Sequence, residues 1–203
     1  MDVYETIGQI KLVPVTVFKS LDDVRPTLDA LNKGNVPVTE ICFRTECAKE
    51  AIKIARKEFP DMLVGAGTVI NAIQCKDALE AGAMFIVSPG FSDEVLELCI
   101  LNNIPYIPGV VTPTEIMRAL ENGLNILKFF PADVFEGLKA IKALSSAFPQ
   151  VQFMPTGGVS NENLKEFISN KAVFACGGSW LVKGTPEEIT KTCLEATKIV
   201  KGE

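Results

Sequence analysis

The most constraining feature of this sequence is a repeated pair of patterns, in which a short apolar run rich in β-branched residues precedes a segment with helical spacing. Eight such runs begin 21 to 26 residues apart. They cover residues 12–17, 38–43, 63–66, 84–87, 105–110, 126–130, 151–154 and 173–176. Between runs, apolar residues recur at helical intervals, as at Val24, Leu28 and Leu31. The sequence therefore predicts strands and helices in strict alternation.

Eight strand and helix units in a row predict one particular α/β architecture. Strands joined by helical crossovers lie parallel, and eight of them close a (β/α)8 TIM barrel. A doubly wound open sheet is the alternative, but it more often carries a glycine-rich motif after its first strand, where this chain has Phe18-Lys19-Ser20. Since no linker or low-complexity segment interrupts the series, we predict a compact single domain over residues 1–203.

Local signals mark several helix ends. Thr112 and Thr185 are each followed by Pro and, three residues on, by Glu115 and Glu188, which is the pattern of a capping box. Gly34 stands where a helix is expected to end in the left-handed conformation.

Composition narrows the chemistry, because the chain has no histidine among its 203 residues. Ser-His-Asp triads, Cys-His pairs and His-ligated metal sites are therefore excluded. Proton transfer falls to Asp, Glu, Lys, Cys, Tyr or water. The six cysteines form no CxxC pair, and we expect them to be reduced and buried in a cytoplasmic protein.

The charge pattern argues against two classes of partner. The net charge is −5 and the 20 basic residues are scattered, so no basic stripe for nucleic acid is present. No apolar run approaches the roughly 18 to 20 residues that span a bilayer. We therefore expect no nucleic-acid or membrane partner.

Lys128 is the only lysine inside a predicted strand core. Alternation places Ile126, Lys128 and Phe130 on one strand face, which points into the barrel if the opposite face packs on the helices. A lysine amine kept from water becomes a nucleophile suited to Schiff-base chemistry. The alternative is a buried stem whose ammonium reaches the rim.

The second predicted strand carries complementary groups. Glu40, Cys42 and Arg44 share one face, so Glu40 is expected inside the barrel. An inward carboxylate is either paired with Lys128 or Arg44 or used in proton transfer, and the two roles are compatible. Arg44 at the mouth could bind a carboxylate, with Thr68 adding a hydroxyl, or could be an ordinary rim arginine.

Two glycine pairs follow the seventh and eighth predicted strands, Gly157-Gly158 and Gly177-Gly178-Ser179. Barrels often bind phosphate on backbone amides at these two strand ends. A single pair is more often a tight turn, but two at these positions favour a phosphate site. We expect Trp180 to fill space behind the last loop rather than to contact a ligand.

Six motifs in chain order together resemble the 2-keto-3-deoxy-6-phosphogluconate (KDPG) aldolase family, also called the 4-hydroxy-2-oxoglutarate aldolase family. They are EICFRTECA from Glu40, VGAGT from Val64, SPG from Ser88, KFFPA from Lys128, PTGG from Pro155 and GGSW from Gly177. The resemblance implies a class I aldolase, a carbon–carbon lyase that splits KDPG into pyruvate and glyceraldehyde 3-phosphate and can also split 4-hydroxy-2-oxoglutarate into pyruvate and glyoxylate. It further implies a cytoplasmic homotrimer acting on small 2-keto acids without cofactor or metal.

The resemblance also assigns roles to single residues. Lys128 forms the Schiff base, and Glu40 is the general acid/base, working with a bound water. The substrate-binding positions are Arg44 and Thr68 for the pyruvyl carboxylate, Pro89 and Phe130 for the pyruvate pocket, Thr156 for the C4 hydroxyl, and Gly157, Gly158 and Ser179 for the phosphate. Many members carry an arginine at the end of the first strand, where this chain has Val17-Phe18-Lys19, so Arg44 must supply that charge.

Three other functions fit parts of the pattern. A phosphosugar isomerase or synthase could use the same barrel and phosphate loops, because fold alone does not fix the reaction. An aldolase for the galactonate epimer differs by one stereocentre of the substrate. A non-catalytic phosphate-binding scaffold is the third, and the polar groups converging on one barrel end argue against it.

Overall fold

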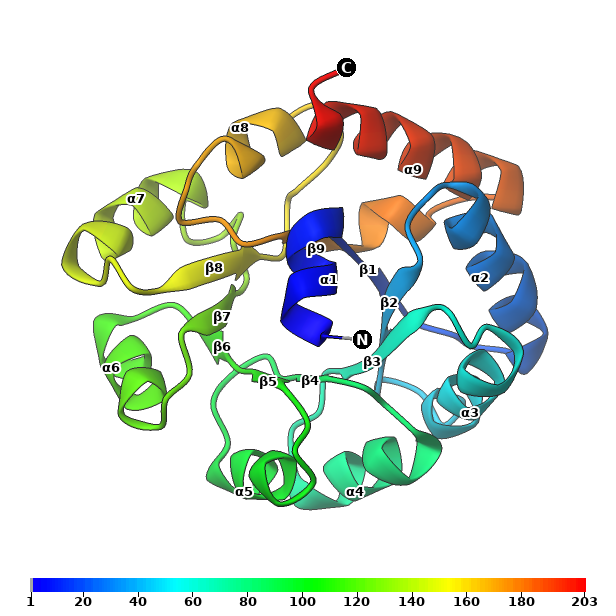
Figure 1. The fold of residues 1–203 in the computed structure, drawn as a ribbon, viewed down its shortest axis with the longest axis horizontal. Coiled ribbons are helices and arrows are strands. Elements are labelled where there is room, and N and C mark those ends of the chain that lie inside the picture. Colours follow the sequence, from blue (N-terminus) through cyan, green and yellow to red (C-terminus); the bar gives the residue numbers. More distant parts are fainter. Residues whose placement is uncertain (1) are drawn as a thin grey trace.

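The alternating pattern folds into parallel strands with helices on the outside (Figure 1). The structure is a computed structural model and describes residues 2–203. The strands are β1 Leu12–Thr16, β2 Val38–Cys42, β3 Leu63–Gly67, β4 Ile86–Val87, β5 Tyr106–Ile107, β6 Gly109–Val110, β7 Ile126–Phe129, β8 Gln152–Pro155 and β9 Cys176–Gly178. The helices are α1 Val3–Ile10, α2 Val24–Lys33, α3 Ala48–Glu58, α4 Ala72–Ala81, α5 Asp93–Leu101, α6 Pro113–Glu121, α7 Leu138–Ala147, α8 Leu164–Ile168 and α9 Pro186–Lys201, with short 3₁₀ turns η1 Leu21–Asp23 and η2 Ser179–Val182.

The strands form two parallel sheets, and the larger one is curled. Six strands lie in the order β5-β4-β3-β2-β1-β9, and three lie in the order β6-β7-β8. In the larger sheet Glu40 is in register with Val15 on one side and Gly65 on the other. In the smaller sheet Lys128 is in register with Gly109. The expected parallel α/β fold is confirmed.

Two of the predicted runs differ from the strands that form. The run at residues 105–110 is divided into β5 and β6 by Pro108, which has no backbone N–H to give to a neighbouring strand. The run at 173–176 gives only the start of β9, because the regular pairing with β1 begins at Cys176. The other runs match their strands within a few residues.

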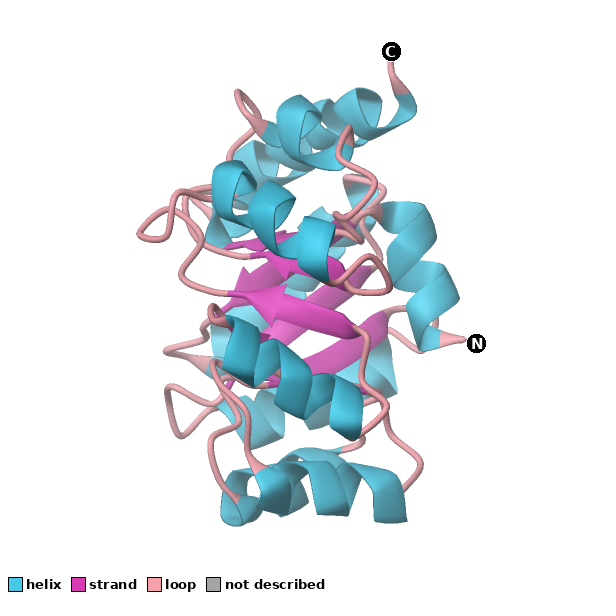
Figure 2. Cartoon of the chain, turned by 90° about the vertical axis from the view of Figure 1, so that its left-hand side faces the viewer, coloured by secondary structure: helices cyan, strands magenta, loops and turns pink. Residues whose placement is uncertain are grey.

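All strands point the same way, which defines two ends of the sheets (Figure 2). The loops that leave the strand tips lie at the carboxyl end. Helix α1 lies across the amino end, in the middle of the view in Figure 1. Its Val3 and Ile7 are buried, and it has contacts with β1.

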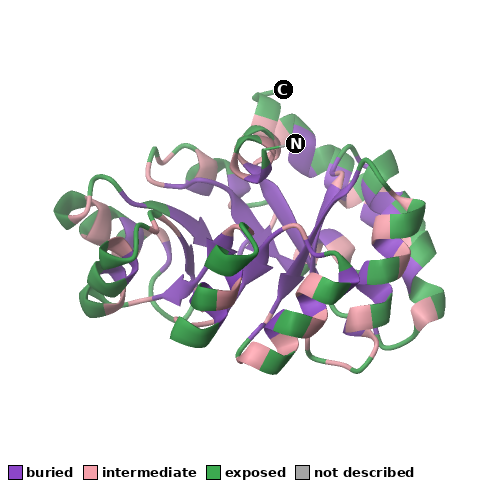
Figure 3. Ribbon diagram, turned by 60° about the horizontal axis from the view of Figure 1, so that its bottom comes forward, coloured by how far each residue is buried: buried purple, intermediate pink, exposed green. Residues whose placement is uncertain are grey.

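Burial follows the layers, since the strands are buried and the helices expose one face (Figure 3). Every residue of β1, β2 and β3 is buried. Both capping boxes form as predicted, at Thr112 with Glu115 and at Thr185 with Glu188.

The prediction for Gly34 was wrong. It ends α2 with φ of −79°, outside the left-handed region. Glycine is needed there because a methyl group would collide with Cys193 Cβ of α9.

Between residues 2 and 203, no helix is long and apolar enough to cross a membrane.

Candidate active site

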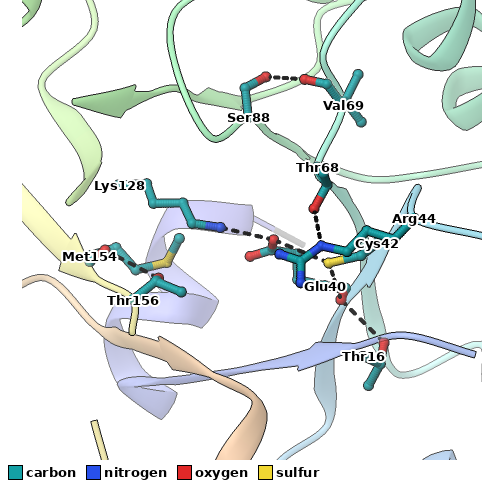
Figure 4. Close-up of polar contacts among 10 residues, drawn as sticks. All are labelled: Thr16, Glu40, Cys42, Arg44, Thr68, Val69, Ser88, Lys128, Met154 and Thr156. Carbon is teal, nitrogen blue, oxygen red and sulfur yellow. Dashed lines mark hydrogen bonds and ion pairs between the residues drawn. The ribbon is translucent and has the colours of Figure 1, made fainter. Parts of the chain in front are cut away.

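A buried ion pair connects the six-stranded sheet to the three-stranded sheet. Lys128 of β7 donates from Nζ to Glu40 Oε1 of β2 over 3.2 Å, and their side chains are 3% and 0% exposed (Figure 4). Alternation along β2 and β7 accounts for the inward direction of both side chains. Removing two charges from water is costly, so a buried ion pair of this kind marks a candidate functional site.

The second carboxylate oxygen of Glu40 has no protein partner. Oε2 is buried without a hydrogen bond, while Oε1 accepts the hydrogen bond from Lys128 Nζ. A methyl group at Gly67, the last residue of β3, would collide with Oε1. The carboxylate therefore fits against a bare backbone, and its free oxygen is available to a water or a substrate hydroxyl.

Cys42 lies beside the same carboxylate. Its Sγ is 3.8 Å from Glu40 Oε1 and 3.9 Å from the Glu40 carbonyl oxygen. Burial, reinforced by the charge of Glu40, raises the pKa of the Cys42 thiol to about 12. The group is thus a protonated thiol at neutral pH and not a thiolate nucleophile.

Arg44 and Thr68 meet at the carboxyl end, as the sequence predicts. Arg44 Nε donates to Thr68 Oγ1 over 3.0 Å (Figure 4). Thr68 has φ of 53°, a left-handed conformation in the first residue after β3. The rest of the Arg44 guanidinium stays available, which suits a bidentate contact with a carboxylate.

A cavity of about 380 Å³ opens at this end. It is lined by Val15, Val17, Arg44, Phe130, Thr156, Gly157, Gly158, Val159, Ser160, Gly178, Ser179, Trp180 and Lys183. Phe130 connects the cavity to the ion pair, because Lys128 Nζ lies 5.4 Å from the centre of its ring. The structure therefore gathers six of the predicted substrate-binding residues on one cavity and places Lys128 next to it.

The glycine pair after β8 is shaped by its contacts. Gly157 and Gly158 have φ of 102° and 71°, which side chains rarely adopt. Both pack against Asp133, and the Gly158 carbonyl accepts a hydrogen bond of 2.8 Å from Asn163 Nδ2. This loop turns sharply beside the cavity and brings its backbone to the cavity wall.

Thr156 and Pro89 occupy different surroundings. Thr156 is buried, lines the cavity and pairs with Gly177 through an isolated bridge. Pro89 follows β4 and does not line the cavity. Its carbonyl oxygen packs against Gly109, the register partner of Lys128.

Two lining residues escaped the sequence prediction. Trp180 was expected behind the last loop, but it lines the cavity and donates from Nε1 to Asn161 Oδ1 over 3.0 Å. Lys183 lines the cavity just beyond η2. In the sequence, Lys183 precedes Gly-Thr-Pro and looks like an ordinary surface lysine. Predicting that it lines the cavity would have required knowing where it lies relative to β8.

The arrangement has the parts needed for imine chemistry. An amine and a carboxylate are in contact in a buried place, and cationic groups line the cavity beside them. In the part of the chain described, no group of three or more His, Cys, Asp or Glu could hold a metal ion.

Comparison with known proteins finds close similarity. The model of the KDPG and KHG aldolase family matches residues 3–195. A KHG/KDPG aldolase of Escherichia coli strain K12 is 43% identical over 196 residues, which is 94% of this chain and 92% of the relative. The Zymomonas mobilis ZM4 KDPG aldolase structure with 3-phosphoglycerate has a TM-score of 0.91 and 37% identity, covering 97% of this chain and 96% of that one.

A third similar protein bears on the chemistry. The KDPG aldolase of Legionella pneumophila, with pyruvate captured at low pH as a covalent carbinolamine intermediate, has a TM-score of 0.87 and 39% identity. The match covers 100% of this chain and 98% of that one.

Proposed function

The chain belongs to the KDPG and KHG aldolase family and is a carbon–carbon lyase, and from this premise we propose that it splits KDPG into pyruvate and glyceraldehyde 3-phosphate through a Schiff base on Lys128. The observation that carries the proposal is the 3.2 Å contact between the buried Lys128 amine and Glu40 carboxylate. The same chemistry would split 4-hydroxy-2-oxoglutarate into pyruvate and glyoxylate, with no metal or cofactor.

The first half of the reaction builds the imine. Glu40 takes a proton from Lys128 Nζ, and the neutral amine attacks the C2 carbonyl carbon of the substrate to give a carbinolamine. Glu40 then returns a proton to the C2 hydroxyl, which leaves as water, and the protonated imine forms. A single carboxylate in contact with Nζ can serve both transfers because it alternates between base and acid.

The second half breaks the carbon–carbon bond. Glu40, directly or through a water at its free Oε2, removes the proton of the C4 hydroxyl. The C3–C4 bonding electrons move into the imine, the aldehyde leaves, and an enamine remains on Lys128. Protonation at C3 and addition of water release pyruvate and restore the amine.

The cavity supplies a place for each part of the substrate. Arg44 with Thr68 binds the carboxylate, and Phe130 borders the pyruvyl group. Pro89, outside the cavity lining, borders that group from the loop after β4, beside Gly109 and Lys128. Thr156 contacts the C4 hydroxyl. The backbone amides of Gly157, Gly158 and Ser179 bind the phosphate, which is supported by their position on the cavity wall.

We extend the proposal to the assembly. Over the described residues 2–203 the chain forms one domain and a closed (β/α)8 barrel, in which β5 and β6 are one strand divided at Pro108. The bridges from Phe153 to Val173 and from Thr156 to Gly177 support closure between β8 and β9. The protein acts as a homotrimer in the cytoplasm, supported by exposed apolar side chains such as Ile73 and by six free cysteines.

Borohydride trapping tests the reaction. Reduction in the presence of pyruvate should add one pyruvate-derived adduct, which peptide mass spectrometry should locate at Lys128. Lys128→Met should show no adduct and no pyruvate release from KDPG. Because this variant leaves Glu40 buried without its partner, Lys128→Met with Glu40→Gln serves as the folded control. The proposal is overturned if folded protein is not modified at Lys128, or if untreated enzyme of the same preparation, which traps pyruvate at Lys128, releases no pyruvate from KDPG.

A further inference from the structure

We propose that Lys183 sets the preference of this enzyme for phosphorylated over unphosphorylated 2-keto acids, by placing a positive charge at the phosphate end of the cavity. The inference rests on the proposed function and adds to it a specificity-determining residue. Backbone amides already favour an anion, and an ammonium adds a full positive charge that interacts much more strongly with a phosphate than with a hydroxyl.

The charge of the cavity wall is the first observation. Among residues 2–203, the charged side chains lining the cavity are Arg44 and Lys183, and both are cationic. The whole chain has a net charge of −5, so this local excess runs against the overall charge. Asp133 packs against the glycine pair without lining the cavity, and its Oδ1 accepts the Val134 N–H over 3.1 Å. Two cations on one cavity match a ligand with two anionic ends.

The division of labour between the two cations is the second observation. Arg44 follows β2, where its Nε is bound to Thr68. Lys183 directly follows η2, which begins at Ser179 after β9. The segment that presents Ser179 to the phosphate therefore also carries Lys183, while Arg44 comes from the strand that carries Glu40.

The third observation is that Lys183 is uncommitted. In the described chain it has no ion pair within 4.0 Å. Neighbouring carboxylates have other donors, since Glu188 Oε2 accepts the Thr185 N–H over 2.6 Å and Glu195 Oε2 accepts from Asn161 Nδ2 over 3.4 Å. A ligand phosphate would not have to displace a protein carboxylate to reach the ammonium.

The kinetic test compares two substrates that differ only in the phosphate, KDPG and 2-keto-3-deoxygluconate. Lys183→Met keeps much of the side-chain length but removes its charge. We expect the KM for KDPG to rise about 5- to 20-fold, with kcat within about twofold, because an exposed charge contributes mainly uniform binding. The kcat/KM for 2-keto-3-deoxygluconate should stay within about twofold. Lys183→Arg should keep most of the preference.

Lys191→Met is the matched control. Lys191 is an exposed lysine of α9 outside the cavity lining, and its loss changes the net charge by the same amount. It should leave both substrates unaffected. The effect of Lys183→Met should also shrink as salt rises toward 0.5 M, because the ammonium lies where ions can screen it.

A binding measurement adds a readout separate from turnover. Trp180 is the single tryptophan of the chain and lines the same cavity, so its fluorescence can follow a titration with inorganic phosphate. Lys183→Met should weaken phosphate binding by a factor similar to the KM change. Lys191→Met should bind phosphate as the unaltered protein does.

Three results would overturn the inference. They are an equal loss on both substrates in Lys183→Met, no change on either, or the same loss in Lys191→Met. Failure of the proposed function looks different, because pyruvate trapping at Lys128 would then be absent from the unaltered protein. Lys183→Met should trap pyruvate normally, since pyruvate has no phosphate.

Discussion

Two hollows lie at opposite ends of the strands, and the buried ion pair of Lys128 and Glu40 lies next to the smaller one. The hollow at the amino end measures about 770 Å³ and is bordered by Asp2, Tyr4, Arg56 and Asn103 among others. The cavity at the carboxyl end measures about 380 Å³. Both contain an arginine, so neither volume nor the presence of a cation separates them. The difference lies in the buried charges beside each hollow.

At the amino end, the polar groups serve the fold. Arg56 Nη1 donates to Met84 Sδ over 3.0 Å, and burial raises the pKa of the Tyr4 hydroxyl to about 12, which keeps it neutral. At the carboxyl end, Lys128 and Glu40 form a buried ion pair. A desolvated ion pair beside an open cavity is therefore a better guide to the active site than cavity size.

Removing one carboxylate should give the largest contrast between the two ends. We expect Glu40→Gln to lower kcat by about 10² to 10⁴, because the amide cannot accept and return protons. Arg56→Gln at the amino end should leave kcat within about twofold. The measurement is pyruvate release from KDPG, with circular dichroism to confirm folding.

Trapping with borohydride sharpens the same comparison. Glu40→Gln should still form some adduct at Lys128, because water can accept the Nζ proton slowly in place of Glu40 and the reduction is irreversible. If Glu40→Gln turned over at the normal rate, or if Arg56→Gln were as slow, the contrast between the two ends would disappear.

Substituting a glycine at each end should have a smaller effect, on kcat at the carboxyl end and on stability at the amino end. In Gly67→Ala the new methyl would displace the Glu40 carboxylate, and we expect kcat to fall about 10- to 100-fold. In Gly82→Ala at the amino end, the residue has φ of 93° and the methyl would lie 3.4 Å from Arg56 Cγ. That variant should lose about 1 kcal/mol of stability to backbone strain, with normal kcat. Thermal unfolding and kcat together check the pair, and the reverse assignment of losses would contradict it.

The smallest effect separates Glu115, a carboxylate that caps a helix, from Glu40, the proposed catalytic carboxylate at the same end. Partial burial acts to raise the pKa of Glu115, but hydrogen bonds from the Val111 and Thr112 N–H groups and the Thr112 hydroxyl outweigh it, and the pKa is lowered. A carboxylate with a lowered folded-state pKa stabilises the fold above its unfolded value near 4.5 and loses that contribution as pH falls through the folded-state pKa.

Glu115→Gln should therefore cost about 0.5 kcal/mol at pH 7, after allowance for solvent screening, and should lose this difference as the pH falls below about 4.5. Urea unfolding at pH 7 and pH 3 measures it. Activity at pH 7 should not change, in contrast to Glu40→Gln. A difference that grew at low pH would reverse the expected sign.

Much of the fold was predictable because it repeats. The eight runs placed nearly every strand, and the capping boxes at Thr112 and Thr185 placed two helix starts. The helix Val3–Ile10 was not predicted, since eight residues at a chain end give a weak periodic pattern. Gly34 was misjudged because its requirement comes from Cys193, which is far away in the sequence.

For the candidate site too, some features follow from local sequence patterns and others depend on segments that are far apart in the sequence. Alternation placed Glu40 and Lys128 on inward faces, but their contact depends on how β2 and β7 face one another across the interior, which no local pattern contains. The roles of Trp180 and Lys183 depend on how the end of β9 sits beside the loop after β8. Local chemistry was therefore predictable, and distances between distant segments were not.

The position of α1 has a kinetic consequence. With Ile7 fully buried and the helix laid across the amino end, the cavity next to Lys128 opens at the carboxyl end. In the proposed mechanism, the fragment bonded to Lys128 lies at the inner end of this cavity, and the phosphate-bearing fragment lies toward its opening. Products must then leave in a fixed order, the aldehyde first and pyruvate last, and in the synthetic direction pyruvate must enter first.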